Sequence, residues 1–405
     1  MNDKVVITGF GLVSSLGLTA SETWESLLSG QSGIRPAEGT DMQGFNCKAA
    51  APVNGLDPSG LGIHPRDARI MDKHSHMLMK CGQDAYKHAK LDTASIPAEE
   101  TGFYAGMGMI DYNISDLLPA VLKSLDTRNN LDYDAFYSRA YQEIHPLWPL
   151  SMLNNISFCQ VAINLGLKGE NTVFSPHADS GAQAIIEGVN SIIEKKAQAV
   201  LAGGVSEKIS PMSLARSSWF GGTVPGEGCG IIALELLSSA KNRQTSCFAA
   251  ITGYACAFEK SGGPHGPSST AVSNAMDQAI SRAGLRPSDI DLIIAHGDGT
   301  HAGDKNEIEA INNTFSDCLD KVNVFTSKGA LGHLLAAAPA VDIILGIYML
   351  RDGIIPAVCN ASPVDKDIRF KVACNVPVKK DLKRILINAC SYEGQCASLI
   401  IEKVV

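Results

Sequence analysis

The stretch VFSPHADSGAQAII, residues 173–186, decides the fold. A short apolar run leads into a turn of small residues that Gly181 closes, and the residues after Ala182 have the composition of a helix. This strand–turn–helix layout is the elbow that lifts a catalytic nucleophile out of the backbone and points it at a pocket. The turn contains no cysteine, and Ala178 stands at its tip.

Two pairs of similar segments recur along the chain in the same order. Residues 4–17 and 248–262 each combine a short strand pattern with Ile-Thr-Gly, an aromatic residue and a loop of small residues. Residues 197–207 and 383–394 each show a buried strand followed by a small-residue loop. The tripeptide alone is common, but two matches in order favour a duplicated α/β unit. We therefore predict halves at 1–245 and 246–405.

Between these segments, apolar strands alternate with helical patterns. We predict helices at 21–29, with a serine N-cap, at 182–196, and at 333–350, where Pro339 should cause a kink. Residues 292–300 form an apolar strand that runs into a glycine turn. Near-continuous apolar strands that alternate with helices indicate a sheet covered by helices on both faces.

Composition narrows the functional class. The chain has 405 residues and a formal net charge of −8, which argues against a nucleic-acid partner or an anionic membrane surface. Its apolar runs are too short to span a bilayer, and the N-terminus does not resemble a signal peptide, so we expect a cytoplasmic protein. Eleven cysteines without a CxxC pair favour buried reduced thiols over disulfides or a metal site.

Polar side chains follow two of the predicted strands. His296 begins the turn HGDGT, and His333 follows Lys328 by five residues in SKGALGH. A single histidine beside glycines is usually just a polar residue with satisfied hydrogen bonds. Two such histidines offer imidazole N–H donors that can converge on one carbonyl oxygen, with a lysine to orient them. This arrangement stabilises an enolate or oxyanion, as in decarboxylation of a malonyl thioester or acyl transfer.

The sequence resembles the β-ketoacyl synthases of the thiolase superfamily, in particular β-ketoacyl-acyl carrier protein synthase II and type II polyketide ketosynthases. The similarity covers essentially the whole chain, and HGDGTHAGDKNEIEA (296–310) and TSKGALGHLLAAAPAV (326–341) carry it. It implies a five-layer αβαβα sandwich built from two βαβαβαββ halves, a dimer and a Cys-His-His site. It also implies no bound cofactor, because an acyl carrier protein presents the substrate on its phosphopantetheine arm.

The resemblance assigns roles to individual residues. It makes His296 and His333 the two catalytic histidines and Lys328 the supporting lysine. It makes Glu307 the acid that holds this lysine. Ala178 occupies the position of the nucleophilic cysteine, and without a thiol no acyl-enzyme forms.

The sequence also departs from the family around this site. We interpret His177 and Asp179, beside the missing thiol, as groups that block or reshape the pocket. The connection after SLARSSWFGG is shorter than the family's by roughly one to two dozen residues. In NACSYEGQCASLII (388–401), Tyr392 keeps the aromatic residue of a glycine-rich gate, whereas Glu393 replaces a glycine.

These departures favour a chain length factor, the subunit without a nucleophile that partners a cysteine-bearing ketosynthase in a type II polyketide synthase. The pair is expected to be a heterodimer, or a dimer of heterodimers, that acts on chains bound to acyl carrier protein. In this interpretation Trp148, Met152 and Phe158 line the elongation tunnel; for each of them, ordinary core packing is the alternative.

Two other functions remain open. A malonyl-acyl carrier protein decarboxylase would need both histidines but no cysteine, and the histidines are present. An active β-ketoacyl synthase with its cysteine replaced is the second alternative, although simultaneous changes in three loops argue against it.

Overall fold

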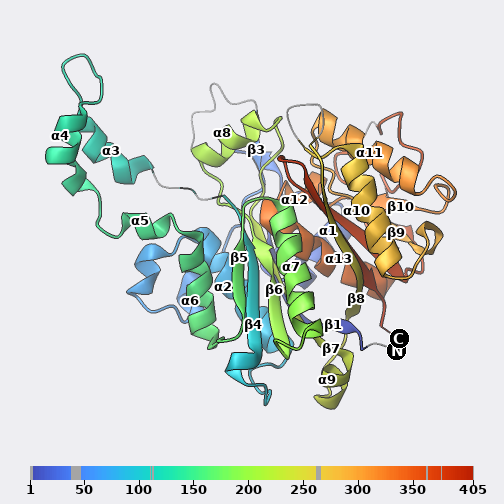
Figure 1. The fold of residues 1–405 in the computed structure, drawn as a ribbon. Helices are drawn as coiled ribbons and strands as arrows, with labels where there is room; N and C mark the ends of the chain where they lie inside the picture. Colours follow the sequence, from blue (N-terminus) through green and yellow to red (C-terminus); the bar gives the residue numbers. More distant parts are fainter. Residues whose placement is uncertain are drawn as a thin grey trace.

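The computed structural model describes residues 3–37, 47–109, 111, 114–260, 266–361, 364–374 and 376–404. Its centre is an eleven-stranded sheet in the order β12-β10-β9-β14-β15-β8-β1-β7-β6-β4-β5 (Figure 1). The strands are β1 (Val5–Ser14), β4 (Thr101–Met107), β5 (Asn171–Phe174), β6 (Ala199–Val205), β7 (Gly228–Leu236), β8 (Ala249–Phe258), β9 (Leu292–Ile294), β10 (Asn323–Phe325), β12 (Lys371–Val372), β14 (Arg384–Cys390) and β15 (Gln395–Glu402).

The sheet consists of the same unit used twice. The first half has the order β5-β4-β6-β7-β1, and the second half has β10-β9-β14-β15-β8 with β12 added at its edge. In each unit the first three strands are parallel and the last two run antiparallel to their neighbours. β1 and β8 pair antiparallel and join the two units. The duplication predicted from the sequence is therefore present in the topology.

Helices lie between the two units and on the outer face of each unit, which gives five layers in the order helix, sheet, helix, sheet, helix. The central layer contains α7 (Ala178–Ile193), which packs on strands of both units, and α13 (Ala338–Asp352), which does the same (Figure 1). α2 (Lys73–His88) and α6 (Asn154–Leu165) cover the outer face of the first unit. α10 (Ser269–Arg282) packs on the outer face of the second unit, with α11 (His301–Thr314) beside it. The predicted α/β sandwich is confirmed.

The remaining elements are short. They are helices α1 (Ala20–Leu28), α3 (Ile114–Leu122), α4 (Tyr133–Ser138), α5 (Trp148–Ser151), α8 (Pro211–Trp219), α9 (Leu237–Asn242) and α12 (Lys328–Leu331), and strands β2 (Arg35–Pro36), β3 (Ala49–Ala50), β11 (Ile354–Ile355) and β13 (Val378–Lys379).

Three predicted helix details differ from the structure. α1 is capped by Thr19, which forms a capping box with Glu22, so the predicted N-cap at Ser21 is wrong. α7 begins at Ala178 rather than Ala182. α13 begins at Ala338 rather than at position 333, so Pro339 lies in its first turn. Proline is accommodated there because the N–H groups of the first turn have no partner within the helix.

One segment stands away from the body of the molecule. The arm, defined as residues 114–147, carries α3 and α4 outward from the sheet beside α5 and α6 (Figure 1). It exposes several large apolar or aromatic side chains: Ile114, Leu118, Leu122, Tyr133, Tyr137, Tyr141 and Leu147. Such a surface is typical of an interaction site.

The cysteines are all free thiols, but they are not all buried. Cys229 is buried as expected, whereas Cys159 is exposed on α6 and Cys247 is half-buried. The prediction of burial was therefore wrong for these two, and also for Cys256, which is exposed, and for Cys359 and Cys374, which are half-buried. For Cys159 the reason is that an outer helix keeps one face in solvent; Cys247 lies in the connection between α9 and β8. No helix in the described ranges is long and apolar enough to cross a membrane.

Candidate functional site

The elbow places Ala178 at the first position of α7, with its side chain fully buried. Close packing fixes this helix terminus: a Cβ atom on Gly181 would lie 1.9 Å from the carbonyl oxygen of Ala336, so glycine is required. The hydroxyl of Ser180 donates to the carbonyl of His177 at 2.5 Å and does not cap the helix. The position of the family's nucleophile thus exists here, but it presents only a methyl group.

His296 and His333 lie beside this elbow, with their Nε2 atoms 3.4 Å apart. The backbone N–H of Cys390 donates to Nδ1 of His296 at 3.3 Å. The N–H of Leu335 donates to Nδ1 of His333 at 3.1 Å. Because each Nδ1 is an acceptor, each neutral ring carries its proton on Nε2. Two N–H donors therefore converge on one point.

Both imidazoles are neutral near pH 7. Burial, with the Lys328 ammonium nearby, lowers the pKa of His333 to about 3. Burial, reinforced by His333 and Lys328, holds the pKa of His296 well below its ordinary value. Neutral rings act as hydrogen-bond donors to a carbonyl oxygen and do not act as acids.

Lys328 is held by a different acid from the one predicted. Its Nζ lies 2.9 Å from a carboxylate oxygen of Asp342 and 3.5 Å from the carbonyl oxygen of Ala295. Ser327 donates to the other Asp342 oxygen at 2.6 Å. Asp342 is the one charged residue in the apolar run 338–350, which was an available signal for a functional partner.

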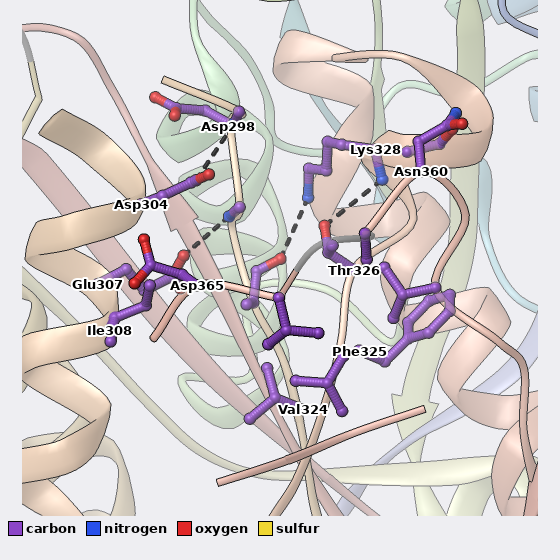
Figure 2. Close-up of a pocket in the computed structure, with 18 of the residues that line it drawn as sticks. Asp298, Asp304, Glu307, Ile308, Val324, Phe325, Thr326, Lys328, Asn360 and Asp365 are labelled. Atoms are coloured by element: carbon purple, nitrogen blue, oxygen red, sulfur yellow. Dashed lines mark hydrogen bonds between the residues drawn. The ribbon is translucent and has the colours of Figure 1, made fainter. Parts of the chain in front are cut away.

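Glu307 instead organises the turn that carries His296. Its two carboxylate oxygens accept the backbone N–H groups of His296 and Gly297, each at 2.8 Å. The amide of Asn388 donates to the same carboxylate at 3.0 Å. Glu307 therefore positions the histidine through the backbone. Figure 2 shows it across a cavity from Lys328.

A closure of aromatic rings and one His–Glu hydrogen bond fills the space beside the elbow. His177 Nε2 lies 2.9 Å from a Glu393 carboxylate oxygen, and its ring packs edge-on against Tyr392 and Phe220. Those two rings are stacked with their centroids 4.3 Å apart. The Tyr392 hydroxyl lies 3.2 Å from that of Thr223. A space of about 20 Å³ remains, roughly enough for a single water molecule.

Asp179 lies outside this closure. It is buried in the first turn of α7 and accepts a hydrogen bond from the Gln183 amide at 2.9 Å. Burial, with the Glu393 carboxylate nearby, raises the pKa of Asp179 to about 6, although His177 opposes this shift.

The predicted tunnel residues lie apart from the histidines. Phe158 is buried and stacks on Phe103 with ring centroids 4.3 Å apart. In this chain it is therefore part of the hydrophobic core. Trp148 and Met152 are half-buried at α5. For these two, a tunnel-lining role stays a prediction that depends on a partner subunit.

Sequence reasoning missed a buried ion pair next to the closure. Glu207 follows β6, and Arg216 on α8 pairs with it. Both line the small space beside His177, as does Phe220. A glutamate at the end of a buried strand was the available signal for this pair.

Comparison with known proteins matches these features. Residues 2–240 match the N-terminal domain of β-ketoacyl synthases, and residues 248–362 match their C-terminal domain. The chain belongs to the β-ketoacyl synthase family. This confirms the resemblance predicted from the sequence.

Individual relatives cover the full chain. The 3-oxoacyl-[acyl-carrier-protein] synthase 2 of Staphylococcus aureus (strain COL) is 26% identical over 426 residues, 99% of each protein. That of Coxiella burnetii is 27% identical over 427 residues, again 99% of each. Among solved structures, the ishigamide ketosynthase/chain length factor has 25% identity and a TM-score of 0.87, with both chains fully covered. A β-ketoacyl synthase of Burkholderia phymatum, 23% identical with a TM-score of 0.87 and full coverage of both chains, shares the fold.

Asp304 gives the site a pH-dependent cost in stability. Burial, with Asp298, Glu307 and Asp365 nearby, raises its pKa to about 7 from an ordinary 3.8. Below pH 4 this carboxyl group is protonated in both the folded and the unfolded state. Between pH 4 and pH 7 it ionises mainly in the unfolded state, so the free energy of unfolding falls until the pH has passed 7. We expect D304N to raise the unfolding free energy by up to about 4 kcal/mol at pH 8 and by almost nothing at pH 4. Urea denaturation at both pH values measures this.

The matched control for this measurement is D320N, which removes an exposed carboxylate. We expect it to change stability by less than about 0.5 kcal/mol at either pH. An equal effect of D304N at pH 4 and pH 8 would show that titration of Asp304 is not the cause.

Proposed function

We propose that this chain is the partner subunit without a nucleophile, of the chain length factor type, in a β-ketoacyl synthase pair. The observation that carries the proposal is the buried methyl group of Ala178 at the tip of an otherwise intact elbow. Without a thiol, covalent capture of an acyl group has no starting atom. The closure by His177, Tyr392 and Glu393 leaves no room for an acyl chain beside it.

The surface supports a protein partner. β5 is the edge strand of the sheet and pairs only with β4 among the described strands, so its outer side is free for another strand. α6 lies next to it and exposes 72% of Ile163. The arm adds further apolar side chains on the same half of the molecule (Figure 1). Together they form one candidate interface.

In such a pair, the chemistry belongs to the cysteine of the other subunit, and this chain helps to wall the space that receives the growing chain. Trp148 and Met152, at the base of the arm, are the residues we propose for this wall. An acyl carrier protein would present the substrate. One solved relative, with 22% identity and a TM-score of 0.82, is a type II polyketide ketosynthase in complex with its acyl carrier protein.

Co-expression with a cysteine-bearing ketosynthase tests the proposal. We expect the two chains to purify at one-to-one stoichiometry and to elongate malonyl units only together. I163D should abolish co-purification, because it places a charge in the apolar interface. F258D is the matched control, since Phe258 is 67% exposed on the other half. Elongation by this chain alone would refute the proposal.

A decarboxylase is a second candidate, and the histidine pair favours it. Two neutral Nε2–H groups 3.4 Å apart can hold the carbonyl oxygen of a malonyl thioester as carbon dioxide leaves. The closure at His177 argues against access by that route. Carbon dioxide release from malonyl-acyl carrier protein, lost in H333A, would establish this activity.

A further inference from the structure

A larger cavity, of about 830 Å³, is lined by His333 and Lys328 and lies next to the small space at the elbow, with which it shares His333 and Thr223. It lies where the parallel strands β9 and β10 end, between the turn 297–299, α11 and the segments 358–361 and 364–372 (Figure 2). The carboxyl ends of parallel strands are the usual location of ligand sites in α/β proteins. Its volume is in the range of small-molecule sites.

The cavity has an apolar floor. Aliphatic and aromatic side chains from α11, β10, β12 and the segments 358–361 and 364–370 form it: Ile308, Ile311, Val324, Val358, Phe370 and Val372. Such a surface favours a ligand with a hydrocarbon body, because each buried methylene group contributes about 0.8 kcal/mol.

One wall of the cavity is anionic. Figure 2 shows Asp298, Asp304, Glu307 and Asp365 on the same side, across from Lys328. Within the described ranges none of these four carboxylates has an ion-pair partner; they accept hydrogen bonds from N–H groups, and Asp298 also from the Thr300 side chain. Lys328, the buried cation nearby, is already paired with Asp342.

The carboxylates of this wall repel one another. Asp298 and Glu307 are more than nine-tenths buried. Burial, with the repulsion from these two carboxylates added to it, raises the pKa of Asp304 to about 7. A cation placed between these groups would relieve the repulsion, whereas an anion would increase it.

We propose that this cavity binds an organic cation with an apolar body, a primary ammonium or guanidinium group on a hydrocarbon chain or ring. The ammonium donates to Asp298 and Asp304 while the hydrocarbon covers the floor at Ile308 and Ile311. The acidic wall and the apolar floor come from the second half of the chain, and Ile34 and Thr223 of the first half also line the cavity; β5 and the arm do not. The site therefore goes beyond the proposed partner role and does not depend on it.

Isothermal titration with n-alkylammonium ions tests the proposal on the full chain. We expect n-octylammonium to bind with one-to-one stoichiometry and n-octanoate to bind at least ten-fold more weakly. The dissociation constant should fall by roughly three- to four-fold for each methylene group from butyl to octyl. Failure of n-octylammonium to bind, or equal binding of octanoate, would overturn the proposal.

Variants of the wall and the floor separate this site from binding elsewhere. We expect D304N to weaken n-octylammonium binding about ten-fold, and I308W to weaken it by occupying the floor from a half-buried position. D320N is the matched control and should leave the dissociation constant unchanged. Unchanged binding in both D304N and I308W would place the ligand elsewhere and refute the assignment. Circular dichroism of each variant verifies that it is folded.

Discussion

In the A178C variant, we expect the introduced thiol to remain without an acyl group after incubation with an activated acyl thioester. Position 178 is fully buried, and the closure leaves about 20 Å³ beside the neighbouring His177. An acyl group cannot reach the sulfur while His177 stays bonded to Glu393. The tryptic peptide 169–195 contains no other cysteine, so mass spectrometry of this peptide reports position 178 alone.

Opening the closure should change this result. Adding H177A and E393G to A178C removes the ring that lines the space and the carboxylate that holds this ring, and we expect the acylation rate to rise at least ten-fold. A182C is the matched control, because its thiol would be equally buried on the same peptide but farther along α7. Acylation of A178C without the opening substitutions would show that the closure does not control access.

The fold was predictable because its determinants are local. Each strand of the repeat is an apolar run followed by small residues, so the paired segments at 4–17 and 248–262 became β1 and β8. β1 and β8 occupy equivalent places in the two units, because the strands of each unit follow one another along the chain in the same order. The apolar pattern could not predict where helices begin, since α7 starts with the buried turn residue Ala178.

The polar contacts of the site were less predictable because they join distant residues. His177 and Glu393 are separated by 216 positions and meet only through the packing of α7 against β15. Asp342 and Glu307 were both available as the acid that pairs with Lys328. The direction in which α13 runs brings the Asp342 carboxylate to the lysine ammonium. Phe158 faces the core because α6 packs that side on β4.

The buried pair of Lys328 and Asp342 should be a major determinant of stability. Their side chains are 7% and 1% exposed. D342L leaves the ammonium with only the distant carbonyl of Ala295, which should cost about 3–5 kcal/mol of unfolding free energy. Guanidinium denaturation measures this loss. K4M, which breaks the exposed pair with Glu402, is the control and should cost less than about 1 kcal/mol.

The double variant K328M/D342L separates charge from volume. Replacing a buried pair by apolar side chains of similar size removes the desolvation cost together with the attraction, so we expect most of the stability lost in D342L to return. If D342L alone costs less than about 1 kcal/mol, the ammonium has found other partners and the pair is not needed for stability. If the double variant is stable and still co-purifies with its partner, the ion pair serves the histidine site rather than the scaffold. Loss of partner binding in a stable double variant would instead tie the pair to assembly.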